Sequence, residues 1–194
     1  MSDPVEVLDF WLGAIGPEGW YAGGAEVDGL CRDNFGDLWQ AAHEGGLDHW
    51  AEGGPAGALA LIVICDQFAR NIWRGDARAF ATDPLALRTA RLALSQGWDL
   101  EAPEPERQFF YMPFEHSENP EDQALAVELM AERMPSEPEM LLHARAHQAV
   151  IARFGRFPFR NAALGRVSTP EEAVFLAEGG YASMVNQLRA EAMQ

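Results

Sequence analysis

The sequence contains no lysine, and its 14 basic residues, all arginine, face 30 acidic residues in a chain of formal net charge -16. The negative electrostatic potential around such a chain disfavours nucleic acid and anionic membranes as partners, because phosphate binding needs a broad basic surface. Only two cysteines are present, too few for the disulfide framework of a secreted protein. The longest apolar run, residues 56–65, is too short to span a bilayer. No basic segment precedes the first apolar residues, as a signal peptide would require, so we expect a cytoplasmic protein.

The chain also lacks the alternation of apolar and polar residues, with hairpin turns, that is typical of antiparallel strands. It marks helix starts instead, with an N-cap residue, a proline at the first helical position and acids in the first turn. These starts are Asp3, Asp83, Asn119 and Thr169, and Ser136 forms a capping box with Glu139. We therefore predict an all-α fold of about 8–9 helices, a compact antiparallel bundle or short solenoid, in a single domain over residues 1–194.

Other helices are predicted from apolar spacing alone. Residues 27–42 have helical periodicity, and the almost wholly apolar segment after Pro55 predicts a central helix buried on all sides. A further helix is expected over residues 103–111. The long helix after Ser136 should end at Gly155, which can adopt the left-handed conformation of a C-cap. One or two last helices, over residues 171–188, break near a pair of glycines.

Arginines are clustered in two places in this acidic chain. Residues 141–170 contain five arginines and no acid, whereas residues 101–140 contain two arginines and eleven acids. Arg70, Arg74 and Arg78 directly follow the apolar segment. A guanidinium binds a carboxylate or a phosphate through two parallel hydrogen bonds. Each cluster therefore either locks the fold through buried ion pairs or lines a site for an anionic partner.

The first candidate site surrounds the turn at Gly155. The side chains of Arg153, Arg156 and Arg160 are expected to point outward around this tight turn. Arg156 and Arg160, with Asn161 beside them, are candidates for holding a carboxylate or a phosphate. In the alternative interpretation these arginines cap helix C-termini and pair with internal acids.

The second candidate site combines carboxylates with imidazoles. Glu115, His116 and Glu118 lie just before a helix start, and His143 and His147 lie one turn apart on the long helix. Such groups suit acid–base chemistry, or ligation of zinc, iron or manganese. In the alternative, His147 is a hydrogen-bonded core residue, and we expect no metal and no cofactor.

The third candidate site follows the apolar segment. Asp66 and Arg70, four residues apart, are expected to pair along one helix face. In a functional interpretation Asp66, Gln67 and Asn71 form the floor of a cleft with Arg74 at its mouth. In the structural alternative the ion pair fixes the angle between helices.

Three segments resemble a bacterial domain-of-unknown-function family, number nine-two-four. They are LALIVICDQFARNIWRGDARAFATDPLAL, RQFFYMPFEHSENPEDQ and HARAHQAVIARFGRFPFRNAALGRVSTPEEAVFL, and the resemblance extends over residues 7–180. It implies an all-helical, tetratricopeptide-like fold and carries no established activity. Two positions depart from the family pattern: Ala69 stands where proline is usual, and Phe159 where histidine is usual. If that histidine takes part in chemistry, this chain lacks it.

The leading hypothesis is a binding module that recognises an anionic small molecule or an acidic protein segment through the arginines. The alternative is an enzyme, a metal-assisted or acid–base hydrolase, in which Glu115, His116, Glu118 and His147 act on an anionic substrate. Both versions predict that the two arginine clusters and the segment around His116 meet in space. Similarity to a repeat family that binds proteins favours the module, by fold analogy alone.

Overall fold

Every regular element of the computed structural model is a helix within residues 3–22 and 24–192, the residues that the structure describes. The predicted all-α fold is therefore confirmed for this part of the chain. The chain divides into two compact units, the first ending at Pro113 and the second beginning at Phe114. We describe each unit by itself, and the single domain predicted over residues 1–194 stays a prediction.

The first unit contains six α-helices and two π-helical segments among its described residues. In chain order they are α1 (Pro4–Leu8), η1 (π, Asp9–Ile15), α2 (Gly16–Trp20), α3 (Ala25–His43), α4 (Gly54–Ile62), η3 (π, Val63–Phe68), α5 (Ala69–Ile72) and α6 (Asp83–Gln96). Short 3-10 turns lie at η2 (Asp48–Trp50), η4 (Ala77–Phe80), η5 (Trp98–Glu101) and η6 (Glu106–Phe110). The helix expected over residues 103–111 is thus only a 3-10 turn.

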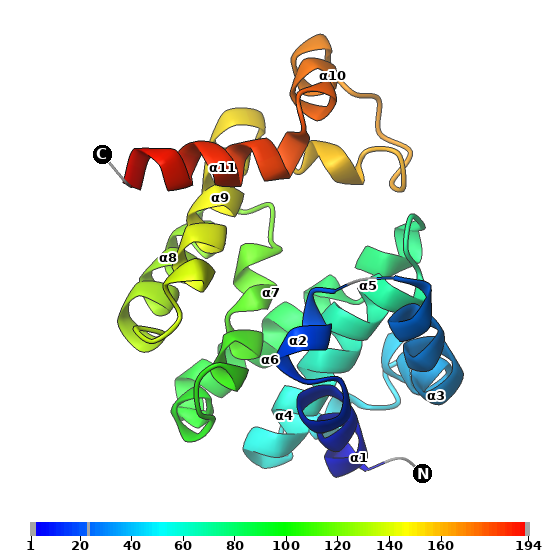
Figure 1. The fold of residues 1–194 in the computed structure, drawn as a ribbon. Coiled ribbons are helices and arrows are strands. Elements are labelled where there is room, and N and C mark those ends of the chain that lie inside the picture. Colours follow the sequence, from blue (N-terminus) through cyan, green and yellow to red (C-terminus); the bar gives the residue numbers. More distant parts are fainter. Residues whose placement is uncertain (1–2, 23, 193–194) are drawn as a thin grey trace. The chain divides into compact units, whose positions relative to one another are not determined.

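The second unit follows the short α7 (Met112–Glu115), which crosses the boundary. Its elements are α8 (Pro120–Arg133), α9 (Pro138–Phe154), the 3-10 turn η7 (Pro158–Arg160), α10 (Pro170–Ala177) and α11 (Gly180–Ala192). Helices α8 and α9 pack side by side, and α11 crosses α9 (Figure 1). The predicted break before α11 is confirmed.

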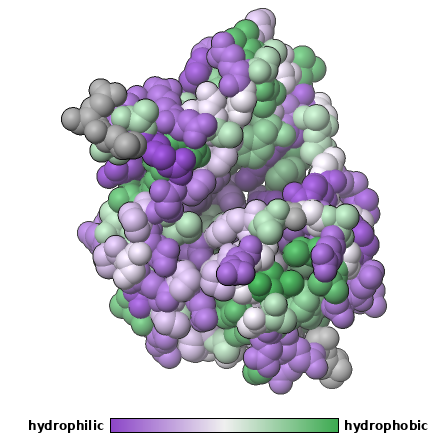
Figure 2. Space-filling view, in the orientation of Figure 1, coloured by the Kyte–Doolittle hydropathy of each residue, from purple (hydrophilic) through white to green (hydrophobic). Residues whose placement is uncertain are grey.

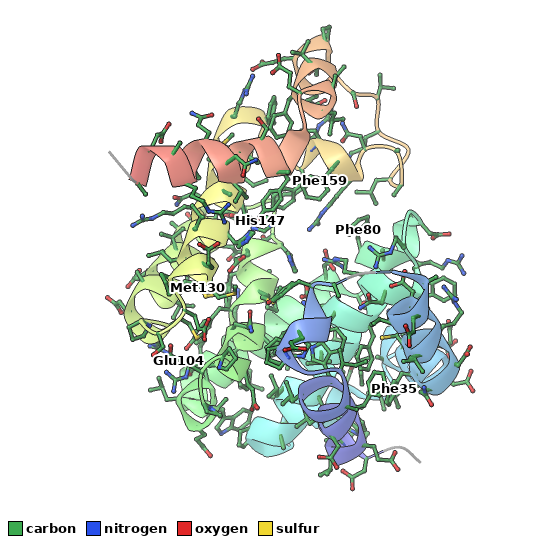
Figure 3. All side chains as sticks on the ribbon, in the orientation of Figure 1. Phe35, Phe80, Glu104, Met130, His147 and Phe159 are labelled. Atoms are coloured by element: carbon green, nitrogen blue, oxygen red, sulfur yellow. The ribbon has the colours of Figure 1, made fainter. Side chains whose placement is uncertain are left out.

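The apolar segment after Pro55 forms the centre of the first unit. Helices α4 and α5 and the π-helical segment between them run without interruption from Gly54 to Ile72. Residues 57–69 are all buried, as expected for a helix surrounded by other elements. Aromatic rings pack against this centre. Phe68 stacks on Phe35, which Figure 3 labels, at 4.9 Å between centroids, and Trp11 meets Phe68 edge-on at 5.5 Å. Asp66 and Gln67 therefore sit at the end of a well-packed core.

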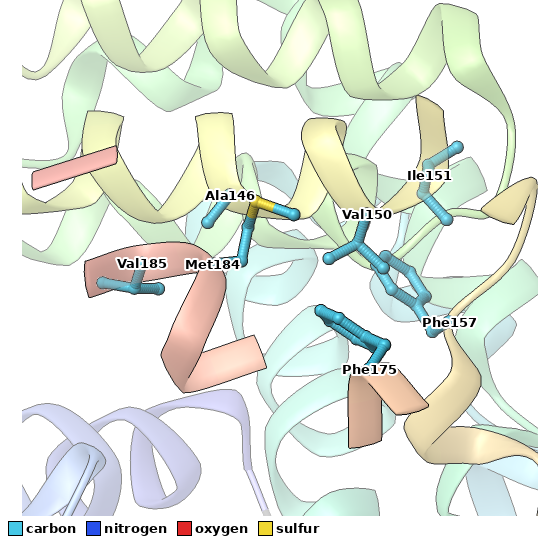
Figure 4. Close-up of a cluster of buried hydrophobic side chains, with 7 residues drawn as sticks. All are labelled: Ala146, Val150, Ile151, Phe157, Phe175, Met184 and Val185. Carbon is cyan, nitrogen blue, oxygen red and sulfur yellow. The ribbon is translucent and has the colours of Figure 1, made fainter. Parts of the chain in front are cut away.

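A separate apolar cluster holds the second unit together. Val150 and Ile151 on α9 pack with Phe157, Phe175 and Met184, and Figure 4 shows the whole cluster. His147 lies three and four residues before Val150 and Ile151, on the same face of α9, and its ring packs edge-on against Phe157. The histidines of α9 therefore border this core.

Three of the predicted helix starts are confirmed. Asp3 and Thr169 each form a capping box, and the Asn119 side chain accepts a hydrogen bond from the backbone of α8. Two further helices begin within two residues of the predicted start, but their predicted caps are wrong. Asp83 is the first residue of α6 rather than its cap, and α9 begins at Pro138 with Glu137 at the N-cap, so Ser136 does not form the predicted box.

The face seen in Figure 2 is covered mainly by hydrophilic residues on both units, with hydrophobic residues in small scattered patches. This agrees with the chain's excess of acidic residues. Among residues 3–22 and 24–192, no helix combines the length and the apolar character that crossing a membrane requires.

Candidate functional site

The ion pair predicted between Asp66 and Arg70 forms and gains a third member. The Arg70 Nη2 atom lies 3.6 Å from Asp66, and Nη1 and Nη2 donate to the two carboxylate oxygens of Asp83 at 2.7 and 3.0 Å. Arg70 also donates to the carbonyl oxygen of Ala79. Burial alone would lower the Arg70 pKa, but the charges of Asp83 and Asp66 outweigh burial and raise it. This guanidinium is committed to internal acceptors, which favours the structural interpretation of the segment.

The polar residues around this pair form one continuous network. Gln67 Nε2 donates to Asp66 Oδ2 at 2.6 Å, and Asn71 Nδ2 donates to the Gln67 carbonyl oxygen at 3.1 Å. Arg74 donates through Nε and Nη2 to both carboxylate oxygens of Asp28, at 2.8 and 2.7 Å. The guanidinium group of Arg74, predicted to lie at the mouth of a cleft, is thus already bound by the Asp28 carboxylate of α3.

Arg156 is likewise engaged by an internal acid. Its Nε and Nη2 donate to the two oxygens of Glu172 at 2.6 and 2.8 Å. Asn161 Nδ2 and the Thr169 backbone N–H donate to the same carboxylate. The hydrogen bond from Arg156, followed by the one from the Thr169 backbone, lowers the pKa of Glu172 to about 2. Glu172 therefore occupies the position that an external anion was expected to take.

The depressed pKa gives this pair a defined pH dependence. A carboxyl with an ordinary pKa of 4.5 and a folded value of about 2 stabilises the fold fully above pH 4.5 and loses that effect as the pH falls through 2. We expect Glu172→Gln to lower the melting temperature at pH 7, and the difference from the wild type to shrink between pH 4.5 and 2. Thermal unfolding followed by circular dichroism measures it. Glu171→Gln, at an exposed pair with Arg153, is the control and should change little; a pH-independent difference for Glu172→Gln would contradict the assignment.

The other arginines near the turn also have internal contacts. Gly155 adopts the predicted left-handed conformation (φ 68°). Arg153 pairs with Glu171 at 3.0 Å on the surface. Arg160 is buried, with its guanidinium carbon 4.6 Å from the centroid of the Phe157 ring. The turn thus forms as expected, while its arginines bind parts of the same unit.

Glu118 connects distant parts of the second unit. It accepts hydrogen bonds from Arg166 Nη1 and Nη2 at 2.8 and 2.9 Å, and from the Phe157 backbone N–H at 2.8 Å. Partial burial alone would raise its pKa, but the hydrogen bonds from Arg166 and Phe157 lower it. These contacts favour a structural role for Glu118 over the acid–base role predicted from the sequence.

Glu115 and His147 meet inside the second unit. The Glu115 Oε2 atom lies 3.3 Å from His147 Nδ1, and the Glu115 residue is only 3% exposed. The His116 ring lies edge-on to the His147 ring, with centroids 5.8 Å apart. Figure 3 shows His147 on α9 and Phe159 in the segment before α10. Three of the four acid–base candidates are thus brought together, around His147.

His147 has two further neighbours, of which His143 was part of the second candidate site and Tyr181 was not among the predicted residues. Tyr181 Oη lies 2.7 Å from His143 Nδ1 and 3.4 Å from His147 Nδ1. Burial, opposed by the charge of Glu115, lowers the pKa of His143. His143 has a sequence signal, since it lies one turn before His147. Tyr181 is 34 residues from His147 and lies on another helix, so no local pattern identifies it.

A metal site is not formed by these groups in the described part of the chain: within residues 3–22 and 24–192 no three His, Cys, Asp or Glu side chains are arranged to hold an ion. The residues closest to a ligand set are Glu115, His116 and His147. Asp66, Gln67, Arg70, Asn71 and Arg74 belong to the first unit, and Glu115, His147, Arg156 and the other candidates belong to the second. The prediction that the two sets meet stays a prediction.

Comparison with known proteins agrees with the resemblance noted in the sequence. A family model described as "Bacterial protein of unknown function (DUF924)" matches residues 7–180. A solved structure described as "Structure of Protein of Unknown Function ATU0120 from Agrobacterium tumefaciens" is 42% identical, with a TM-score of 0.83, over 90% of this chain and 97% of that one. A search of curated proteins found no match. The chain thus belongs to the bacterial family of unknown function DUF924.

Proposed function

We propose that the chain is an acid–base catalyst of hydrolysis, with His147 as the group that takes and returns the proton. The observation that carries this proposal is the contact of 3.3 Å between the buried carboxylate of Glu115 and His147 Nδ1. A carboxylate that orients an imidazole and stabilises its protonated form is the recurrent arrangement of histidine general bases.

The surroundings of His147 define which ring nitrogen acts. Nδ1 faces two acceptors, the Glu115 carboxylate and the His143 carbonyl oxygen at 3.0 Å. Both require a donor, so the proton of the neutral ring is assigned to Nδ1 and the lone pair to Nε2. No residue in the part of the chain that the structure describes hydrogen bonds to Nε2. Nε2 is therefore available to a substrate or a water molecule.

Tyr181 and His143 add further contacts around the same ring nitrogen of His147. A lowered pKa keeps His143 neutral near pH 7, so its Nδ1 can accept the hydrogen bond from Tyr181 Oη. The Tyr181 oxygen then presents its lone pairs to His147 Nδ1. Three acceptors thus surround Nδ1 and hold the ring so that Nε2 faces away from them.

The reaction class follows from what contacts His147. Both cysteines are buried, so neither thiol is accessible to a substrate as a nucleophile. In the proposed step Nε2 takes a proton from water while the water oxygen attacks the carbonyl carbon of an ester. His147 then returns the proton to the leaving oxygen as the ester C–O bond breaks.

The hypothesis of an arginine-lined binding site receives less support. Arg70, Arg74 and Arg156 donate to internal carboxylates through two nitrogens each. An external anion would have to displace a carboxylate held at close range, and the displaced acid would lose its partner. An anionic small molecule or an acidic protein segment remains a predicted partner, but we do not expect it to bind through these three guanidinium groups.

The test is hydrolysis of chromogenic esters. The purified protein is assayed with p-nitrophenyl acetate and p-nitrophenyl butyrate by the absorbance of the released p-nitrophenol. The proposal expects turnover of at least one ester that is lost in a His147 variant. Hydrolysis at equal rates by the wild type and the variant, or none above the uncatalysed rate, overturns it.

Glu115 is a positioning residue in this proposal, so its variants should affect the chemical step more than binding. We expect Glu115→Gln to lower kcat by about tenfold or more with a smaller change in KM, because the orienting charge is lost. Glu115→Asp should restore part of kcat. Steady-state kinetics on the best ester provide both constants. Glu118→Gln is the matched control: it breaks the contact with Arg166 and should lower stability with less effect on kcat.

A further inference from the structure

Arg145 differs from the other arginines of residues 141–170. Arg153, Arg156 and Arg166 each pair with a glutamate, and Arg160 is buried against Phe157. Arg145 is exposed on α9 and makes no ion pair or hydrogen bond with any residue in the described ranges 3–22 and 24–192. It is therefore a guanidinium whose donors are available to a ligand.

Arg145 lies on an open groove of about 500 Å³ in the second unit. The α8 side is lined by Pro120, Gln123 and Val127, the α9 side by Arg145, Gln148, Ala149, Ile151 and Ala152, and α11 contributes Leu188. On α9, residues 145, 148, 149 and 152 share one helical face, so small alanines leave space beside the polar groups. The volume falls in the range of small-molecule sites.

One of the residues that line the groove, Gln123, carries an unsatisfied buried acceptor as well. Gln123 is fully buried, and its Nε2 donates to the backbone carbonyl oxygens of Glu115 and Ser117. Three carbonyl acceptors around Nε2, including that of Phe114 at 3.4 Å, fix the orientation of the amide. Its Oε1 atom is buried, and none of the residues that the structure describes donates a hydrogen bond to it. Buried polar atoms are nearly always paired, so this oxygen indicates a missing donor.

We propose that this groove binds a small amphipathic carboxylate that carries a hydroxyl or amide N–H group. Its carboxylate would bind Arg145 and Gln148, and its donor would satisfy Gln123 Oε1. Its hydrocarbon part would pack on the apolar lining, formed by Val127, Ala149, Ile151 and Leu188. The proposal does not rest on the acid–base function and concerns a separate set of side chains.

The charges of the groove select this ligand class. Among the described residues that line the groove, Arg145 is the only ionisable one and none is an acid, although the chain as a whole is strongly acidic. A cation would meet no opposite charge there. One guanidinium suits a single carboxylate. Burial of a hydrocarbon chain against the apolar lining would stabilise the complex, and inorganic phosphate has no such chain.

The test is a titration of the isotope-labelled protein, followed by two-dimensional NMR of its backbone amides. The probes are hexanoate, octanoate, the corresponding ω-hydroxy acids, and hexylammonium as the matched cation. We expect saturable shifts at amides of α8, α9 and α11 with the carboxylates and none with hexylammonium. At least one ω-hydroxy acid should bind more tightly than its parent acid, because its hydroxyl reaches Gln123 Oε1.

Variants distinguish carboxylate binding in this groove from nonspecific attraction of anions to exposed arginines. Arg145→Ala should weaken carboxylate binding by about tenfold or more, the usual effect of losing a charge-assisted hydrogen bond. Arg88→Ala, which removes an exposed arginine of the first unit, is the matched control and should bind as the wild type does. Ala152→Leu should fill the groove and abolish binding while leaving the melting temperature unchanged. Equal binding by the two arginine variants, or shifts with hexylammonium as large as with hexanoate, would overturn the proposal, as would the absence of shifts with every carboxylate.

Discussion

Arg70→Met is expected to lower the free energy of unfolding by about 3–5 kcal/mol, the usual cost of leaving buried carboxylates without their cation. Asp66 is 1% exposed and the Arg70 side chain 22%, so water can compensate only a small part of the loss. Methionine keeps the length and packing of the arginine stem, and the change therefore reports the lost charge and hydrogen bonds. Urea unfolding of the variant and the wild type measures the difference.

Two further variants make this experiment decisive. Arg78→Met removes an arginine that pairs with Asp76 in solvent, and we expect little change. Combining Arg70→Met with Asp66→Asn removes one stranded charge and should recover part of the stability. If Arg70→Met is as mild as Arg78→Met, the network is not a structural element and the arginine is available for a ligand.

The second large effect concerns His147. We expect His147→Gln to lower kcat/KM for the best chromogenic ester by about 10²–10⁴-fold, which is the usual contribution of a general base. Glutamine retains a hydrogen-bonding side chain of similar length but cannot take up a proton at neutral pH. The measurement is the initial rate against substrate concentration for the wild type and the variant.

His49→Gln is the control for this experiment, because His49 is exposed and lies in the first unit. It should leave the rate unchanged. Since the His147 ring also packs against Phe157 at 5.6 Å between centroids, thermal unfolding of His147→Gln is measured in parallel. A loss of activity that merely follows a loss of folded protein would contradict a catalytic role, as would an unchanged rate in a folded variant.

The helices were largely predictable because their determinants are local. Asp3, Asn119 and Thr169 cap the helices they precede, and an apolar run of sufficient length produced the central helix. Prediction was wrong where a distant partner competes for a side chain. The Asp83 carboxylate accepts two hydrogen bonds from Arg70 instead of capping α6, and nothing within four residues of Asp83 indicates this.

The same distinction holds for the candidate site. The pair of Asp66 and Arg70 could be predicted from a spacing of four residues. The pairs of Arg156 with Glu172 and Arg166 with Glu118 connect residues 16 and 48 apart, and composition alone does not identify them. Arg145 has no acid three or four residues away, but neither has Arg153, which the fold pairs with Glu171. The sequence therefore located the arginines without distinguishing occupied from available ones.

The ion pairs made by arginine rather than lysine have a consequence for alkaline tolerance. A lysine ammonium begins to lose its charge near pH 10, whereas a guanidinium stays protonated well above pH 12. Arg70, Arg74 and Arg156, whose pKa values are all raised by their acidic partners, each hold a carboxylate with a cation that does not titrate in that range. Acid breaks these ion pairs by protonating the carboxylates, whereas base does not break them, because it does not deprotonate the guanidinium groups. Their resistance to pH is thus one-sided, extending much further above neutrality than below it.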